Sequence, residues 1–188
     1  MEIDIRIPET GDRTTDEVHS AVAWTAVLAG ATVAVAASFV LLTLAAGFGF
    51  TLESPWPGSR PALTGFSPAL GAGMVTVQVL SCALGGYLAG RLRTKWLNVH
   101  SHEVFFRDTA HGLLVWAVST LLGFALGIVT VLGQPAGLAA ASAQNPNVAA
   151  QFSFFLALGL ILSAFTACVA AAIGGMRRDD MHAKRLTP

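Results

Sequence analysis

The sequence predicts an all-α integral membrane protein in which four transmembrane helices form two tandem repeated hairpins. Of the 188 residues, 54% are hydrophobic and only 12% are charged, whereas a typical soluble domain carries about a quarter charged residues. Charged residues are absent from three long stretches, at 18–52, 61–90 and 109–176. Charge-free runs longer than about 18 apolar residues indicate membrane spans.

Capping and turn residues divide these stretches into four predicted helices. The sequence TTDE offers a capping box before the first helix, and the dipeptides SP and NP combine a capping residue with a helix-initiating proline before the second and fourth. The sequence GQPAG ends the third. The predicted helices run from Thr15 to Phe50, from Pro68 to Leu92, from Asp108 to Gly133 and from Pro146 to Arg178.

The basic residues predict the orientation. Ten of the eleven Lys and Arg residues lie in the two tails or between the second and third helices, which the positive-inside rule places in the cytoplasm. Because no basic segment precedes an apolar run at the N-terminus, we expect no cleavable signal peptide. The predicted segments are a cytoplasmic tail at 1–14, a transmembrane domain at 15–178 with hairpins 15–93 and 108–178 joined by a cytoplasmic loop at 94–107, and a cytoplasmic tail at 179–188.

Rare residue types recur at fixed spacing, which predicts the internal repeat. HSAVAW at 19–24 and HGLLVW at 111–116 share one His–Trp spacing, and the pairs Cys82/Arg91 and Cys168/Arg177 share one Cys–Arg spacing. Two copies with the same orientation form a parallel repeat about an axis along the membrane normal. The predicted anchors at the inner membrane interface are Trp24, Trp116, Arg91 and Arg177, since tryptophan rings and snorkelling arginines favour that layer.

Small and weakly polar residues are expected to hold the helices together. GYLAG at 86–90 and GFALG at 123–127 match the GxxxG pattern, through which helices approach closely in lipid. An alternative is that these residues line a polar pathway. The predicted packing residues are Gln78, Gly86, Gly90, Gly123, Gly127 and Gly174. Cys82 and Cys168 are expected to pack as small apolar side chains.

A cluster of donors before the third predicted helix is a candidate metal site. His100, His102 and His111 could bind zinc or another divalent cation. The alternative is a solvated loop in which Asp108 and His111 cap the third helix. A haem held by two histidines is disfavoured, because all five histidines lie at or beyond the predicted cytoplasmic edge. No cofactor is therefore expected.

Function is limited mostly by what the spans lack. Ion-coupled carriers usually contain an ionisable residue in the middle of a span, and these spans contain none. They also contain no catalytic motif, so we expect no enzyme. The first hypothesis is a structural or accessory subunit of a larger membrane complex, for example respiratory or photosynthetic. Its partners would be lipid, other membrane subunits or copies of itself, and not nucleic acid. The alternatives are a channel or carrier for a small uncharged solute, and a metal or redox sensor at the cytoplasmic face.

Three segments carry a resemblance to a known group of proteins. AWTAVLAGA at 23–31, GGYLAGRL at 85–92 and HGLLVWAVSTLL at 111–122 resemble small four-span bacterial inner-membrane proteins, some of which are labelled PhnA-like. The resemblance covers most of the membrane part but not the tails. It implies a bacterial inner-membrane location and this topology, and it brings no assigned activity and no functional residues.

Overall fold

The computed structural model describes residues 22–47, 68–93, 101–132 and 146–186, and all regular secondary structure within these ranges is helical. The helices are α1 (Trp24–Gly47), α2 (Pro68–Leu92), α3 (Ser101–Leu132) and α5 (Pro146–Leu186). Each contains a segment long and apolar enough to cross a membrane. For the described residues, the prediction of an all-helical protein with four such helices is therefore confirmed.

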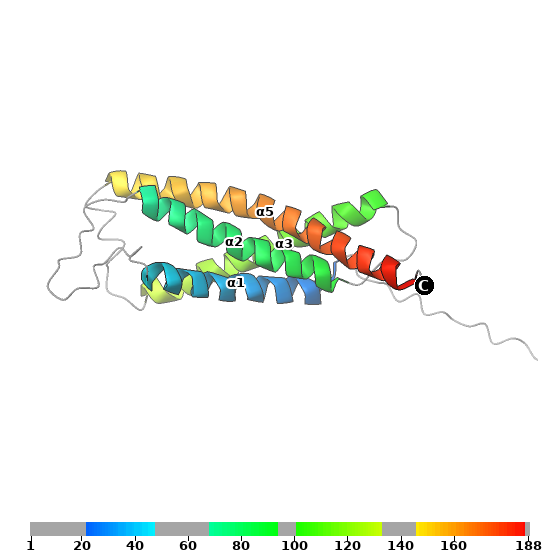
Figure 1. Ribbon diagram of the computed structural model, residues 1–188. Coiled ribbons are helices and arrows are strands. Elements are labelled where there is room, and N and C mark those ends of the chain that lie inside the picture. The colour runs from blue at the N-terminus through cyan, green and yellow to red at the C-terminus, as the bar shows by residue number, and fades with distance from the viewer. Residues whose placement is uncertain (1–21, 48–67, 94–100, 133–145, 187–188) are drawn as a thin grey trace, which may run out of the picture.

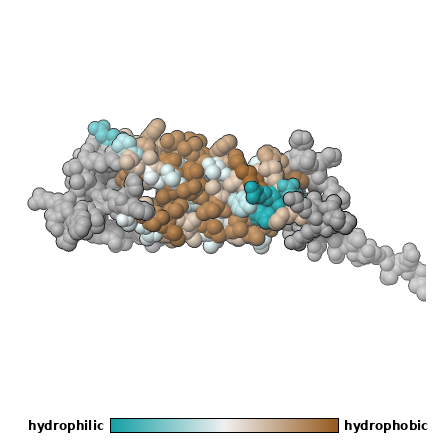
Figure 2. Space-filling view, viewed as in Figure 1, coloured by the Kyte–Doolittle hydropathy of each residue, from teal (hydrophilic) through white to brown (hydrophobic). Residues whose placement is uncertain are grey.

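The helices form a bundle with α2 and α3 at its centre. Each of these two helices contacts the other three, whereas α1 and α5 make their main contacts with the central pair. In Figure 1, α1, α2 and α5 run along the length of the bundle and α3 crosses behind α2. Figure 2 shows a broad apolar band over the middle of the bundle, with hydrophilic residues gathered towards its ends, as a bilayer requires.

Small residues fill the interior, and large apolar residues cover the exterior. Val27, Ala89 and Val115 form the buried core cluster. Phenylalanines such as Phe39, Phe124 and Phe165 are more than half exposed. Lipid tails are as apolar as these side chains, so burying them inside the bundle would bring no hydrophobic gain. The helices instead approach closely, as α1 and α2 do where Gly30 meets Gly85.

Both ends of α2 agree with the predicted bounds. The start of α1, the start of α3 and the end of α5 differ from them. Val22 and Ala23 precede α1, so this helix starts at Trp24 rather than at Thr15. Helix α3 starts at Ser101, before the predicted Asp108, and an ion pair between Glu103 and Arg107 spans one of its first turns. Helix α5 continues past Arg178 to Leu186, since no glycine or proline interrupts that segment. Positions 15–21 and 48–50 lie outside the described residues.

Candidate functional site

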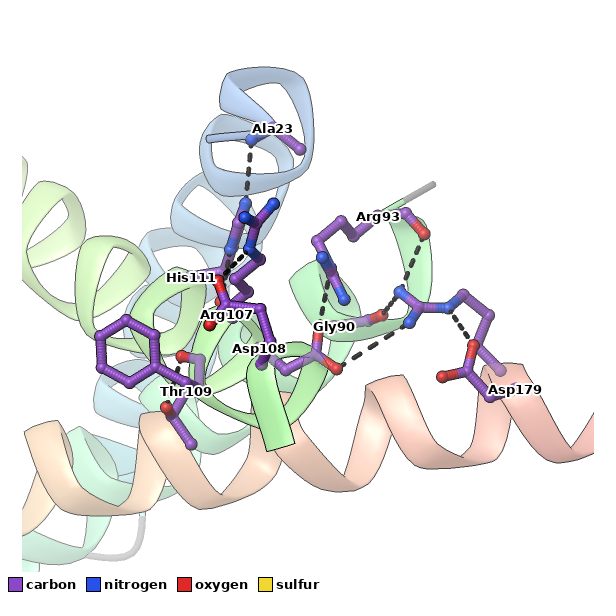
Figure 3. A network of polar contacts seen from close by, with 11 residues as sticks. Ala23, Gly90, Arg93, Arg107, Asp108, Thr109, His111 and Asp179 are labelled. Atoms are coloured by element: carbon purple, nitrogen blue, oxygen red, sulfur yellow. Dashed lines mark hydrogen bonds and ion pairs between the residues drawn. The ribbon is translucent and has the colours of Figure 1, made fainter. Parts of the chain in front are cut away.

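Four charged residues from three helices form a cluster at one end of the bundle, which we call the charge cluster. It comprises Arg93 at the end of α2, Asp108 in α3, and Arg178 and Asp179 in α5 (Figure 3). Arg93 and Asp108 are each 2% exposed and Arg178 is 7% exposed. Charged side chains are almost never this buried unless they are paired.

Asp108 lies between the two arginines of the charge cluster. Its Oδ1 atom is 2.8 Å from Nε of Arg93, and its Oδ2 atom is 3.8 Å from Nη2 of Arg178. Arg178 also donates from Nε to Oδ1 of Asp179, at 3.0 Å. The two positive and two negative formal charges balance. Removing one member would leave an uncompensated charge inside the bundle.

Arg178 also caps the C-terminal end of α2. Its Nη1 atom donates to the carbonyl oxygens of Gly90, at 3.0 Å, and of Arg93, at 2.9 Å. The last carbonyls of a helix have no partner within that helix, and a cation is favourable beside them. This side chain of α5 therefore ties α5 to the end of α2.

Arg93 is held by charge more than by hydrogen bonds. Although its Nε atom lies near Asp108, the geometry does not meet that of a hydrogen bond, and Nη1 and Nη2 have no hydrogen-bond partner in the described part of the chain. Burial lowers the pKa of the Arg93 guanidinium, and attraction to Asp108 opposes this effect. An arginine guanidinium is effectively always protonated in proteins, so Arg93 stays positively charged.

A glycine makes room for the Asp108 carboxylate. A Cβ atom at Gly175 in α5 would overlap the carboxylate oxygens of Asp108. The side chain from α3 therefore lies directly against the backbone of α5. Any larger residue at position 175 would push Asp108 away from Arg93 and Arg178.

His111 joins the start of α1 to α3. Its Nε2 atom accepts a hydrogen bond from the backbone N–H of Ala23, at 2.9 Å, and its Nδ1 atom lies 2.6 Å from the carbonyl oxygen of Arg107 (Figure 3). A backbone N–H only donates and a carbonyl only accepts, so the ring is neutral with its proton on Nδ1. His111 thus satisfies a backbone N–H at the start of α1, a position that has no partner within the helix.

Replacing His111 by alanine is expected to lower the free energy of unfolding by about 1 kcal/mol, as loss of a helix cap does. Thermal unfolding followed by circular dichroism in detergent measures the effect. Thr109→Ala is the matched control on α3, since it removes only a hydroxyl bonded to the carbonyl of Phe106 in its own helix. Equal unfolding midpoints for both variants would contradict the capping role.

The predicted metal ligands divide between described and undescribed parts of the chain. Both ring nitrogens of His111 take part in hydrogen bonds, whereas the side chains of His100 and His102 lie outside what the structure describes. Among the described residues, no three His, Cys, Asp or Glu side chains are grouped closely enough to hold a metal ion. The three-histidine site stays a prediction.

The predicted packing residues fall into two environments. Gly86 and Gly90 lie against the carbonyls of Ala167 and Ala171 in α5, and Gly174 lies against the carbonyl of Tyr87 in α2. Gln78 places its amide oxygen 2.6 Å from the position of a Cβ atom at Gly159. Around Gly123 and Gly127, by contrast, the space for a Cβ atom is open. The first four residues therefore lie at helix contacts, whereas the last two have free space where a side chain would begin.

The predicted interface anchors also differ in their surroundings. Trp24 is 52% exposed and Arg177 is exposed, whereas Arg91 is half-buried. The indole N–H of Trp116 donates to Oγ of Ser163 in α5, at 3.1 Å, so its polar atom is used between helices. Cys82 is buried and Cys168 half-buried, and both are free thiols. The anchoring role stays a prediction.

The sequence analysis missed the charge cluster. The usable signals were the dense charges around the helix ends, in RLR at 91–93 and MRRDD at 176–180, and the glycine pair just before the latter. No family model, curated protein or solved structure matches this chain. The chemistry of the charge cluster is therefore argued from its own residues.

Proposed function

We propose that the protein is a structural or accessory subunit of a larger membrane complex, which it joins through α3. The observation that carries this proposal is the open environment of Gly123 and Gly127, two glycines four residues apart on α3. Helices in lipid associate where small residues let their backbones approach. A transmembrane helix of a partner subunit, or of a second copy, would fill this space.

The C-terminal part of α3 has an exposed surface that the other described helices do not cover. All seven residues from 121 to 127 are exposed, whereas Gly112, Val115 and Ser119 earlier in the helix are buried. The contrast with α2 is informative, because Gly86 and Gly90 have the same spacing and already lie against α5. In the second motif, by contrast, the space that a Cβ atom would take at Gly123 and Gly127 is open.

A groove beside this surface favours a helix over a polar solute as the occupant. It has a volume of about 450 Å³. Its lining residues from α1 and α3 are Thr32, Val35, Ala36, Phe39, Leu122, Ala125 and Leu126. The hydroxyl of Thr32 is bonded to the carbonyl of Leu28 in its own helix. The lining therefore suits apolar ridges of a neighbouring helix, and it supports the subunit hypothesis over the channel hypothesis.

The proposed setting is the bacterial inner membrane, with both termini in the cytoplasm and two tandem hairpins related by a repeat. The distribution of Lys and Arg supports the orientation. The recurring His–Trp and Cys–Arg spacings support the repeat. The charge cluster would then lie at the cytoplasmic end of the bundle, since it follows the C-terminal end of α2.

The double variant Gly123→Leu/Gly127→Leu tests this function. We expect it to reduce the amount of co-purified complex about tenfold or more, which corresponds to about 1.4 kcal/mol, because leucine side chains would keep a partner helix away. The measurement is particle mass and co-purifying protein after extraction from the native membrane in mild detergent. Gly73→Leu is the matched control, since Gly73 is another open helical glycine, on α2.

Two results would overturn the proposal. One is a wild-type protein that leaves its native membrane as a lone monomer in mild detergent. The other is a double variant that retains the complex as well as the Gly73 variant does. In either case, solute flux in reconstituted vesicles would become the next measurement, because it tests the channel alternative.

A further inference from the structure

Arg93 has more buried nitrogen atoms without a hydrogen bond than any other side chain in the described part of the chain. None of its three guanidinium nitrogens makes a hydrogen bond there, although the residue is only 2% exposed. A guanidinium carries five N–H donors. Burying a charged group without hydrogen bonds is energetically unfavourable. Beyond its ion pair with Asp108, the unused donors of Arg93 indicate a missing hydrogen-bonding partner.

The charge cluster does not supply that partner in full. Asp108 is the carboxylate near Arg93, and it also faces Arg178 at 3.8 Å. Asp179 is hydrogen-bonded to Nε of Arg178, while Nη2 of Arg178 makes no hydrogen bond. His111 is neutral, and Arg107 is ion-paired with Glu103. A further anion would supply acceptors for the donors that Nη1 and Nη2 of Arg93 and Nη2 of Arg178 leave unused.

The position of Arg93 indicates the kind of anion. Arg93 directly follows the apolar segment Pro68–Leu92, so it lies where a membrane-spanning helix leaves the hydrocarbon layer. Lipid phosphates lie at this level. Basic pockets between transmembrane helices are known to bind lipid head groups, and the planar fork of arginine matches two oxygens of a phosphate.

We propose that Arg93 binds the phosphate of an anionic lipid head group in a site between the ends of α2, α3 and α5. Nη2 of Arg178 is the second donor, and Asp108 positions both guanidinium groups. The site is separate from the open face of α3, so this proposal stands independently of the proposed subunit function.

The test is lipid binding by the full chain in maltoside micelles, which contain no phosphate. Phosphatidylglycerol, phosphatidylcholine and inorganic phosphate are added separately, and the shift in unfolding midpoint and the mass of bound lipid are recorded. We expect phosphatidylglycerol to stabilise the wild type and to remain bound at one molecule per chain. Arg93→Gln should weaken this binding about tenfold or more, which corresponds to about 1.4 kcal/mol.

Matched variants separate a specific site from general attraction. Arg91→Gln removes the same charge from a half-buried position on the same helix, and it should bind phosphatidylglycerol as the wild type does. Arg93→Lys keeps the charge beside Asp108 but loses the fork, so it should fold and still bind more weakly. This second variant keeps the test valid if Arg93→Gln fails to fold.

Three outcomes would overturn the proposal. Equal loss of binding in the variants at 91 and 93 would indicate surface attraction alone. Full binding by both variants at 93 would exclude the guanidinium as the ligand group. Stabilisation by inorganic phosphate equal to that by phosphatidylglycerol would assign the site to free phosphate rather than to a lipid.

Discussion

Replacing Asp108 by alanine is expected to lower the free energy of unfolding by about 3–5 kcal/mol, the range found when one partner of a buried ion pair is removed. The variant would leave Arg93 and Arg178 facing each other without their shared carboxylate. Titration of the protein with sodium dodecyl sulfate in mixed micelles, followed by circular dichroism, measures the change. Asp108→Asn separates the loss of charge from the loss of volume.

An exposed ion pair on the same helix provides the control. Glu103 lies 2.6 Å from Arg107, and its side chain is 47% exposed. Since solvent screens such a pair, Glu103→Ala should change the free energy of unfolding by only about 0–1 kcal/mol. If Asp108→Ala were no more destabilising than Glu103→Ala, the charge cluster would not stabilise the bundle.

Replacing Gly90 by alanine is expected to lower the free energy of unfolding by about 1–3 kcal/mol, the usual cost of overpacking. The added Cβ atom would overlap the carbonyl of Ala171 and would also lie 3.0 Å from the backbone nitrogen of Gly175. Backbone atoms cannot rotate away as a side chain does, so α2 and α5 would have to separate. The same denaturant titration measures the loss, and Gly90→Leu should prevent folding.

The opposite sign is expected at Gly73, on the same helix. No neighbouring atom occupies the space of its Cβ, and alanine is favoured over glycine in a helix by up to about 1 kcal/mol. Gly73→Ala should therefore leave stability unchanged or raise it. Equal destabilisation by the two substitutions would mean that helix propensity, and not the contact with α5, determines the effect at Gly90.

The sequence predicted a helix end well where the residues next to that end determine it. The bounds of α2, Pro68 and Leu92, follow from a capping dipeptide and from the arginines beyond the apolar run. The starts of α1 and α3 depend on other helices or on side-chain pairs. The backbone N–H of Ala23 donates its hydrogen bond to a histidine far along the chain, and polar residues from Ser101 onward are helical although they resemble a loop in the sequence.

The candidate site was harder to predict, because neighbouring positions on a helix point in directions about 100° apart. The repeated Cys–Arg spacing includes Arg91 and Arg177, whereas the buried arginines are Arg93 and Arg178. Likewise, two matches to one glycine pattern lie in different surroundings, one against α5 and one open. A sequence pattern identifies residue types, while the direction of each side chain depends on how the helices pack.

The hydrogen bonds at the helix ends have a consequence for biosynthesis. The start of α1 is completed by His111 of α3, and the end of α2 is completed by Arg178 of α5. Ribosomes synthesise the N-terminal half first, so the first two helices enter the membrane with both of these ends unfinished. These two helix ends therefore obtain their hydrogen bonds only after α3 and α5 have been synthesised.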